Sequence, residues 1–241
     1  MYEGVGEGGD RALAIDRRCE DVVFAELERL AADGASFVAV SEERGEVSFG
    51  EGGEDRVVID PIDGSLNARR TLPSHSLSIA VASGPSMADV EFGFVHDFGA
   101  GEEFVAERGA GAILDGEPIA VGPDREKLEV LGIESADPRW VVQSADALAD
   151  TAHRLRAIGA IAVSLCQVAA GRFDAMASLK RCRAVDAAAA QLIVREAGGL
   201  LEFIAYDDPL AAPLDLEPHS PVIAARTPEG LAAVRRVPAW P

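Results

Sequence analysis

Two aspartates placed three residues apart, Asp60 and Asp63, have the type and spacing to bind a metal ion. The β-branched run Val57–Ile59 predicts a buried strand that should end where Pro61 removes a backbone donor. Asp60 is then expected at the strand's end and Asp63 at the start of the next turn or helix, so that the two carboxylates converge. Hard divalent cations prefer such oxygen ligands. The spacing therefore predicts a cation site.

The two residues that follow add a second chemistry. Gly64 and Ser65 would present backbone N–H groups at a helix N-terminus, where unpaired donors and partial positive charge suit a phosphate. On its own, an Asp-x-x-Asp pair is more often a solvated turn than a ligand pair. The strand in front of the pair, together with acidic residues elsewhere in the chain, favours a combined metal and phosphate site.

Elements in the first half of the chain, residues 1–122, must carry this motif. Helical spacing of apolar residues predicts a surface helix over 12–31, and Phe37–Val40 reads as a short strand with Glu42 beyond its carboxyl end. The glycine-rich stretch 44–55 predicts a turn or hairpin. Further strands are expected at 77–82, 90–95 and 103–106. This half is therefore predicted to combine a helix with a mainly antiparallel sheet.

The second half, residues 123–241, is predicted to alternate strands and helices. A boundary is expected at Gly122-Pro123-Asp124, a short polar connection where the composition changes. The sequence pattern predicts strands at 128–133 and 173–177, and helices at 145–154, 157–170 and 187–197. An α/β second half joined to a mainly antiparallel first half makes an α+β protein.

Asp186 is expected immediately before the helix at 187–197. Aspartate is among the best N-cap residues, so a plain cap is one interpretation. A capping carboxylate can also direct an oxygen lone pair out of the helix end, towards a metal. Together with Glu42 and the Asp60/Asp63 pair, Asp186 makes a third acidic position at the end of an element. Metal sites are usually assembled from such element ends, far apart in sequence.

Length and charge limit the class of protein. At 241 residues the chain can bury a substantial core, and a formal net charge of −19 argues against nucleic acid or an anionic membrane as a partner. No apolar run approaches the roughly 20 residues that span a bilayer, and the N-terminus lacks a signal-peptide pattern. Three scattered cysteines agree with a reducing compartment, so we expect a cytoplasmic protein.

The basic residues are almost all arginines, because Lys127 and Lys180 are the only lysines in the sequence. An acidic, lysine-poor surface resembles that of proteins from salt-loaded, halophilic-like cytoplasms, where ions screen self-repulsion. An arginine-biased genome explains the same composition equally well. In either case a phosphorylated substrate must approach an acidic molecule, so the site needs cations of its own.

Three motifs together resemble a known family. They are SEERG at 41–45, VIDPIDGSLN at 58–67 and RAVDAAAAQLIVREAGG at 183–199. Their order and spacing resemble the signatures of the inositol monophosphatase and fructose-1,6-bisphosphatase family, in particular its archaeal-type branch, whose members hydrolyse both kinds of substrate. The resemblance runs from Gly9 to about Arg226. It implies a layered α/β/α/β/α sandwich, two or three Mg²⁺ ions per active site, a small phosphorylated substrate, and a homodimer or homotetramer.

The resemblance also implies metal ligands at the matching positions. Glu42 would bind the first Mg²⁺ and help to activate the attacking water, Asp60 would bridge two ions, and Ile62 would contribute its backbone carbonyl. Asp63 and Asp186 would bind the second ion. Without metal, mutual repulsion among such clustered acids should raise the pKa of at least one of them.

Catalytic and substrate-binding roles follow in the same way. The Ser65 hydroxyl would polarise the water beside Glu42, and the N–H groups of Gly64 and Ser65, next to Asp63, would hold the phosphate. Asp16 would lie near the nucleophilic water and order the site. Arg183, and more weakly Arg172, would bind a second phosphate of a bisphosphate substrate.

Two departures from the family pattern bear on cofactor and substrate. Only nine residues precede Asp10, where the family normally carries a helix and a mobile metal-binding loop. Either the given start falls inside a longer reading frame, or part of the loop that binds the third metal has been lost; as given, the chain is expected to bind magnesium less tightly than full-length relatives. Leu179 and Val185 stand where inositol-specific relatives have a glutamate and often a tryptophan. Both replacements weaken an inositol-only interpretation.

The sequence thus predicts a Mg²⁺-dependent phosphatase that uses metal-activated water to hydrolyse fructose 1,6-bisphosphate, inositol 1-phosphate or both. A 3′-phosphoadenosine or NADP-type phosphatase of the same family is an alternative. A non-catalytic metal- or phosphate-binding regulator is another, although an intact set of acidic ligands argues against it.

Overall fold

The structure, a computed structural model, describes residues 2–5, 11–122 and 128–238. The strands are β1 (Tyr2–Val5), β2 (Arg11–Leu13), β3 (Phe37–Ser41), β4 (Gly45–Phe49), β5 (Arg56–Asp63), β6 (Ser76–Ala82), β7 (Val90–Asp97), β8 (Glu102–Glu107), β9 (Gly111–Leu114), β10 (Glu117–Ile119), β11 (Leu128–Glu134), β12 (Ala152–Arg156), β13 (Ala175–Ser178), β14 (Leu200–Phe203) and β15 (Val222–Ala225). The helices are α1 (Ala14–Ala32), α2 (Ser65–Arg69), α3 (Pro138–Gln143), α4 (Ala145–Thr151), α5 (Ile161–Ala169), α6 (Ala184–Glu196) and α7 (Pro228–Val234), with a 3₁₀ turn, η1, at Met87–Asp89.

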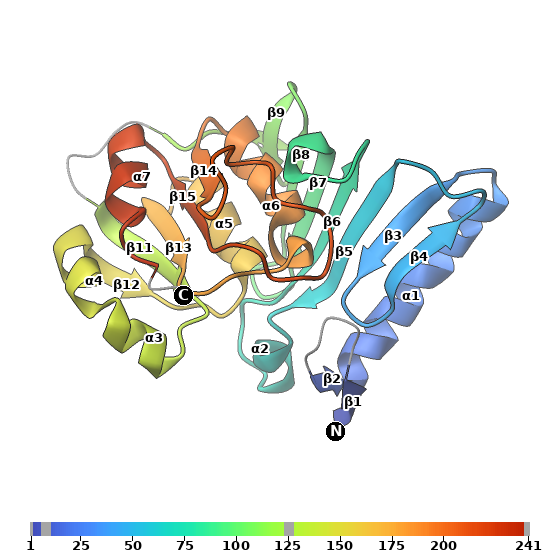
Figure 1. Ribbon diagram of the computed structural model, residues 1–241, viewed down its shortest axis with the longest axis horizontal. Coiled ribbons are helices and arrows are strands. Elements are labelled where there is room, and N and C mark those ends of the chain that lie inside the picture. Colours follow the sequence, from blue (N-terminus) through green and yellow to red (C-terminus); the bar gives the residue numbers. More distant parts are fainter. Residues whose placement is uncertain (1, 6–10, 123–127, 239–241) are drawn as a thin grey trace.

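Two large sheets form the framework (Figure 1). The eight-stranded sheet has the order β10-β9-β8-β7-β6-β5-β3-β4, and β3 and β5 are its one parallel pair among the described strands. The five-stranded sheet has the order β12-β11-β13-β15-β14, with β11 parallel to both of its neighbours. A small β1–β2 ladder stands apart. The predicted α+β class, with a mainly antiparallel first half, is confirmed.

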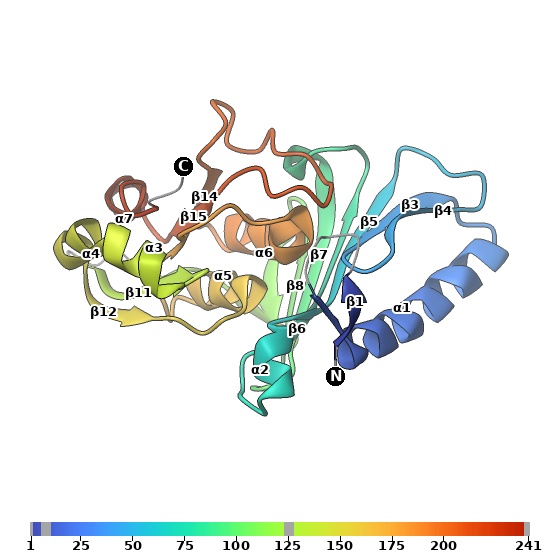
Figure 2. The ribbon, with the colours of Figure 1, turned by 60° about the horizontal axis from the view of Figure 1, so that its bottom comes forward.

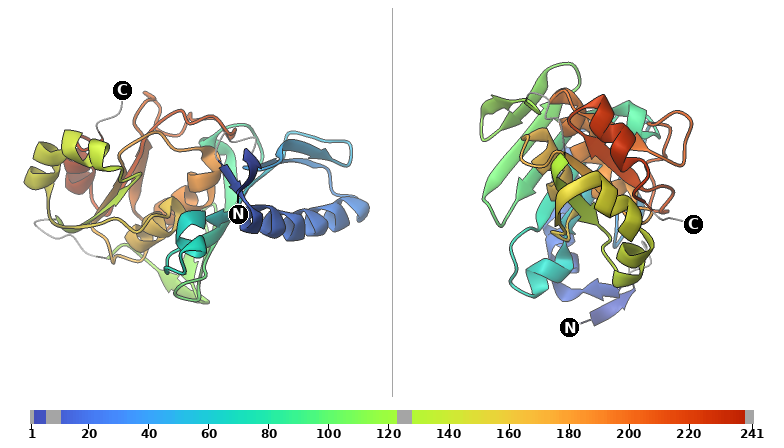
Figure 3. Two further views of the ribbon diagram at one scale, coloured as in Figure 1. Left: turned by 90° about the horizontal axis from the view of Figure 1, so that it is seen from below. Right: turned by 90° about the vertical axis from the view of Figure 1, so that its left-hand side faces the viewer.

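Helices occupy three layers around these sheets. Helix α1 lies on one side of the eight-stranded sheet, α5 and α6 lie between the two sheets, and α3, α4 and α7 lie beyond the five-stranded sheet (Figures 1 and 2). Seen from below, α1 and α4 lie at opposite ends of the molecule (Figure 3). This arrangement confirms the predicted α/β/α/β/α sandwich.

Helix α6 is buried along residues 184–194 because sheet strands or helix α5 pack against its sides. Its alanines 187–190 are all buried, and Gly93 of β7 approaches it so closely that a Cβ there would lie 2.5 Å from the carbonyl oxygen of Ala189. Small residues on both surfaces allow helix and sheet to approach in this way. The close packing fixes the start of α6, and with it Asp186, beside the end of β5.

Helix α1 supports the hairpin that carries a second acidic position, Glu42. Phe24 of this helix is buried against the β3–β4 hairpin, where Phe37 and Phe49 stack with ring centroids 5.0 Å apart. The stretch 44–55, expected to be a turn or hairpin, instead contains strand β4, which pairs with β3, followed by the connection to β5. The β3–β4 hairpin is held against helix α1 by Phe24. Its turn carries Glu42.

Two predicted helices in the second half are shorter than expected. The helix expected over 145–154 ends at Thr151, because residues 152–156 form strand β12, which pairs parallel with β11; sheet pairing overrides the helical periodicity here. The helix expected over 157–170 begins only at Ile161, because Gly159 has φ +81° and ends the preceding turn.

The predicted boundary at Gly122-Pro123-Asp124 falls partly on residues 123–127, which lie outside the described residues, so the division into 1–122 and 123–241 stays a prediction. Within the described part of the chain, the helices are too short or too polar to cross a membrane.

Candidate active site

A bulge in β5 brings Asp60 and Asp63 to the same side of the sheet. Asp60 pairs with Ser78 of β6 and Asp63 with Ser76, so three steps along β5 match two along β6. Residues three apart in a regular strand face opposite sides, and one extra residue reverses that relation. The predicted end of the strand at Pro61 is therefore wrong: β5 runs on to Asp63. The missing N–H of proline is accommodated in the bulge instead.

The parallel pairing of β3 with β5 brings Glu42 to the same edge. Ser41 pairs with Ile59, so Glu42, which follows β3, lies at the level of Asp60 in the neighbouring strand β5. Glu42 lies in the turn between β3 and β4, with 20% of its side chain exposed. The sequence-based expectation of Glu42 beyond a strand's carboxyl end is met.

Asp186 lies inside the first turn of α6, whereas the sequence predicted it just before the helix. Helix α6 begins at Ala184 and Arg183 is its N-cap, so Asp186 occupies the third helical position. Its Oδ2 accepts a hydrogen bond from the Arg183 N–H at 3.0 Å. A carboxylate in the first turn can satisfy such a donor as well as a cap can. The helix starts earlier than predicted because alanine and valine at 184–185 continue the buried apolar surface.

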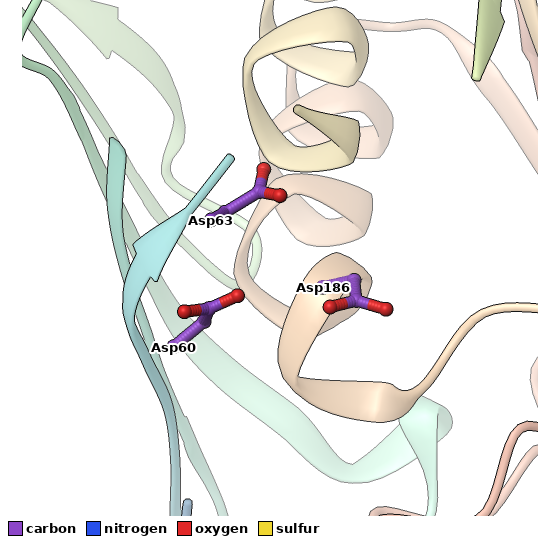
Figure 4. Close-up of side chains that lie close together, drawn as sticks. All are labelled: Asp60, Asp63 and Asp186. Atoms are coloured by element: carbon purple, nitrogen blue, oxygen red, sulfur yellow. The ribbon is translucent and has the colours of Figure 1, made fainter. Parts of the chain in front are cut away.

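Asp60, Asp63 and Asp186 come together at this point. One carboxylate oxygen from each lies within 4.8 Å of the other two, and all three side chains are buried. Figure 4 shows Asp60 and Asp63 projecting from β5 towards the helices, with Asp186 on the first turn of α6. Oxygen donors alone, converging from three segments, fit a hard divalent cation.

The electrostatics of the cluster point the same way. Burial, followed by the negative charges of Glu42, Asp63 and Asp186, raises the pKa of Asp60 well above its usual value. Burial and the charge of Asp186 do the same to the pKa of Asp63. The predicted rise in pKa is therefore present. A divalent cation would relieve both effects, because it supplies the opposite charge that the carboxylates need in a dry environment.

Arg183 connects Glu42 to this cluster. Its Nη1 donates to Glu42 Oε1 at 2.7 Å, and its Nη2 lies 3.4 Å from Asp186 Oδ1. The guanidinium therefore binds two acidic residues from opposite halves of the chain. These contacts were not foreseen, since Arg183 was expected to bind a substrate phosphate; that role stays a prediction.

Asp63 also binds the start of helix α5. Its Oδ2 accepts a hydrogen bond from the backbone N–H of Ala162 at 2.8 Å, and the N–H of Ile161 hydrogen-bonds to the same carboxylate. The N-cap position, Ala160, has no side-chain acceptor for these first-turn donors. A carboxylate from the first half of the chain thus caps a helix of the second.

Gly64 and Ser65 follow directly, at the start of α2. Gly64 has φ +84°, and a Cβ there would lie 3.0 Å from Ser74 O and 3.1 Å from Gly159 O. Only glycine fits this left-handed position without strain. The turn therefore seats against the loop before α5, with Ser65 half-buried beside Asp63.

The remaining predicted residues take different positions. Ile62 donates its N–H to Asp60 Oδ1 at 2.9 Å. Asp16, in the first turn of α1, lies near Glu43: burial raises the pKa of Glu43 to about 7, and the charges of Glu42 and Asp16 contribute. Arg172 donates to both carboxylate oxygens of Glu102 at 2.6 and 2.7 Å, so the described structure gives it a firm partner on β8.

Three further residues line or support the site. Asn67 belongs to the motif at 58–67 but has no predicted role, and Glu134 and Ser135 lie outside every motif. Glu134 ends β11 as a buried carboxylate, and Asn67 donates to the carbonyl groups of Ser74 and Ile158. Ser135 has φ +54°, a strained backbone for a residue with a side chain. A single glutamate or serine at a strand end carries no motif, so only the fold reveals them.

Two adjoining hollows open beside the carboxylates. They measure about 510 and about 480 Å³ and share Ser135, Ala136, Ile161, Arg183 and Asp186. The larger is also lined by Lys180 and Arg181. The acidic cluster thus faces a cavity of small-molecule size with cationic side chains on one wall.

Comparison with known proteins agrees with this geometry. The sequence profile of the inositol monophosphatase family matches residues 3–237. The chain belongs to this family. Two relatives are similar over most of the chain. A fructose-1,6-bisphosphatase/inositol-1-monophosphatase from Methanothermobacter thermautotrophicus is 31% identical over 207 residues, covering 82% of this chain and 72% of that protein. An inositol-1-monophosphatase from Mesorhizobium japonicum is 32% identical over 201 residues, covering 80% and 72%.

Solved structures of inositol monophosphatase family proteins share the fold. A crystal structure of an inositol monophosphatase–fructose 1,6-bisphosphatase superposes with a TM-score of 0.85 at 27% identity, covering 98% of this chain and 88% of that one. The Thermotoga maritima inositol monophosphatase gives 0.78 at 26% identity, covering 98% and 89%. As a family member, the protein is a metal-dependent phosphatase of small phosphorylated sugars or polyols, a phosphoric monoester hydrolase.

Proposed function

We propose that the chain is a Mg²⁺-dependent phosphatase whose substrates are fructose 1,6-bisphosphate, inositol 1-phosphate or both. The observation that carries this proposal is the meeting of three buried aspartates, Asp60, Asp63 and Asp186, within 4.8 Å beside a cavity with cationic side chains. An all-oxygen donor set favours Mg²⁺ over metals that prefer nitrogen or sulfur. The number of ions, two or three, rests on the family resemblance.

Each residue of the site then has a defined task. Asp60, Asp63 and Asp186 would hold the cation, with the Ile62 carbonyl as a further donor. When bound, such a cation lowers the pKa of a water molecule and neutralises charge on the phosphoryl group. Glu42 stands beside the cluster, and its carboxylate would take the proton of the attacking water.

Phosphate binding would fall to the turn after β5. The backbone N–H groups of Gly64 and Ser65 would donate to phosphate oxygens, and the Ser65 hydroxyl would orient the water that Glu42 deprotonates. Asp16, near Glu43, would order the solvent on the far side of the site. Phosphate esters hydrolyse extremely slowly in water, so positioning and charge neutralisation must supply most of the acceleration.

The cationic wall bears on the choice of substrate. Arg181 and Lys180 line the larger hollow with Arg183, where a second phosphate of fructose 1,6-bisphosphate would lie. The same wall supports a second candidate, hydrolysis of a phosphate on a nicotinamide cofactor. A bifunctional NADP phosphatase/NAD kinase from Methanococcus maripaludis is 27% identical over 218 residues, covering 82% of this chain and 38% of that protein.

Phosphate release from a panel of substrates, with Mg²⁺ and with chelator, tests the proposal. The panel holds fructose 1,6-bisphosphate, inositol 1-phosphate, NADP⁺ and 3′-phosphoadenosine 5′-phosphate. Asp60→Asn should abolish Mg²⁺-dependent release, whereas Asp89→Asn, a carboxylate that caps η1, should leave it unchanged. Absence of Mg²⁺-dependent release from every substrate would favour a non-catalytic regulator.

Assembly and location are predicted from the family and the composition. We expect a homodimer or homotetramer, which sedimentation velocity would distinguish from a monomer. A cytoplasmic location is also expected, and fractionation of the native host would test it.

A further inference from the structure

Glu134 is a buried carboxylate that none of the motifs of the site includes. It ends β11, the strand flanked by parallel neighbours on both sides in the five-stranded sheet, and its side chain is almost fully buried. Buried acids need partners, because burial strips the charge of its water. The partners of this one all belong to a single turn and the helix that follows it.

The carboxylate accepts hydrogen bonds from the loop that leads into α5. Oε2 accepts from the Gly159 N–H at 2.9 Å, and Oε1 accepts from the Ile158 N–H at 3.2 Å and from the Ser164 hydroxyl. Three donors from seven consecutive residues therefore converge on one side chain. They fix both the turn and the first turn of the helix relative to β11.

The opposite side of the same turn is bound by the first half of the chain. Asn67 Nδ2 donates to Ile158 O at 2.6 Å, and Gly64 packs against Gly159, where a Cβ on either glycine would crowd the other segment. The left-handed backbone of Gly159 lets the turn fit into this narrow space. The turn is thus clamped between Glu134 on one side and Asn67 on the other.

This clamp determines where the α5 amides lie, and those amides hold Asp63. Ala162 N–H binds Asp63 Oδ2 at 2.8 Å, only three residues after Gly159. A line of direct contacts therefore runs from Glu134 through the turn and the start of α5 to a predicted metal ligand. Outer partners of this kind orient metal ligands, and their loss typically costs about 10–100-fold in metal affinity.

We infer that Glu134 is a positioning residue: it holds residues 158–164 in place so that the α5 amides orient Asp63 for the cation. The inference rests on the proposed function for its metal part, although the placement of Asp63 can be measured without metal. Burial raises the pKa of Glu134 to about 7, opposed by its hydrogen bonds. Burying this carboxylate costs free energy that an apolar side chain at the same place would not cost. That cost agrees with a residue whose role is to hold its hydrogen-bond partners in position.

Glu134→Gln tests the inference at constant side-chain volume. A carboxyl group keeps acceptor lone pairs on both oxygens, whereas an amide presents N–H₂ to one of the three donors. The control is Asp174→Asn at the opposite end of β11, another buried carboxylate that accepts two backbone N–H groups, those of Glu129 and Val130. Asp174 also pairs with the buried Arg226 at 2.9 Å, so this control perturbs the sheet at least as strongly as Glu134→Gln but does so away from Asp63.

Two readouts are taken on the full-length chain. Amide hydrogen exchange followed by NMR in the presence of chelator should show the Ile161 and Ala162 amides exchanging at least about tenfold faster in Glu134→Gln than in the wild type. Calorimetric titration with MgCl₂ should show Kd raised about 10–100-fold. Asp174→Asn should change neither. Circular dichroism establishes that each variant is folded.

The inference is overturned if folded Glu134→Gln keeps both the exchange rate of the Ala162 amide and the Kd for Mg²⁺ within twofold of the wild-type values. If that variant does not fold, Ser164→Ala decides: about threefold faster Ala162 exchange supports the inference, and unchanged exchange overturns it. If the wild type binds no Mg²⁺, the proposed function fails, and the exchange of Ala162 in chelator still decides the role of Glu134.

Discussion

Replacement of Arg183 by methionine should destabilise the metal-free protein strongly, and more at higher pH. The guanidinium binds Glu42 and approaches Asp186, and the three side chains are only 15%, 20% and 12% exposed. Removing one partner of a buried ion pair typically costs about 3–5 kcal/mol, because the other charges are left without compensation. Methionine keeps the aliphatic length of arginine, so the loss is electrostatic rather than a cavity effect.

The sign of the pH dependence follows from the same contacts. Arg183 lowers the pKa of Asp60, so its removal raises that pKa further in the folded state and not in the unfolded state. Because the pKa of Asp60 is already raised in the folded wild type, the extra loss in the variant begins only where pH exceeds that folded pKa and Asp60 of the wild type ionises. From there the loss grows with pH by about 1.4 kcal/mol per unit. At pH 5 Asp60 remains protonated in both folded proteins, so the loss is smaller there than at higher pH. Near pH 7.5 the loss should reach about 3–5 kcal/mol.

Urea unfolding in chelator at pH 5 and at pH 7.5 measures the effect. The control is Arg172→Met, which removes a more exposed pair with Glu102 (43% and 20% exposed) and should cost at most about 1 kcal/mol at either pH. Equal losses for the two variants at pH 7.5, or a loss from Arg183→Met that does not change with pH, would refute the reasoning.

Three further predictions concern single positions. The pKa of Glu134 is raised to about 7, so the stability that this group provides below about pH 4.5 is lost as pH rises to 7, by about 3 kcal/mol. Glu134→Gln should flatten that part of a urea-derived stability curve between pH 5 and 8, and an unchanged slope would count against the assignment. Gly64→Ala adds a Cβ at φ +84°, 3.0 Å from Ser74 O. This variant should have a free energy of unfolding lower by at least about 1–2 kcal/mol and a kcat reduced more than tenfold. Gly101→Ala, at φ +71° with open space around it, is the control for backbone strain alone. Arg181→Ala should raise KM for fructose 1,6-bisphosphate more than for inositol 1-phosphate, and equal changes would place the second phosphate elsewhere.

The sequence was informative about elements and about residue types, and less so about geometry. Apolar periodicity predicted α1 and most strands of the large sheet, because each of those elements buries one side. The convergence of Asp60 and Asp63 was predicted for an incorrect reason. A turn after Pro61 was expected, whereas a bulge inside β5 turns both side chains to one side. Bulges depend on the register with a partner strand, which local sequence does not encode.

The sequence pattern also does not predict the contacts between segments that are far apart in the chain. The pairing of Arg183 with Glu42 and the capping of α5 by Asp63 join residues from opposite halves, and no spacing rule relates them. Glu134 is similar, since a lone glutamate after an apolar strand resembles any solvent-exposed strand end. Its role becomes visible only when the turn at 157–160 is placed against it.

The long sequence separations inside the site also have a consequence for how the protein is made. Asp63 and Ala162 are 99 residues apart and Glu42 and Arg183 are 141 apart, so the carboxylates cannot assemble until nearly the whole chain has been synthesised. Contacts of such separation form late, because closing long loops costs entropy before the contacts repay it. During synthesis the acidic residues of β5 are therefore exposed to the ions of the cell without their helical partners. Capture of Mg²⁺ should accordingly mark the final step of folding, and magnesium depletion should slow the last kinetic phase of refolding while leaving the earlier phases unchanged.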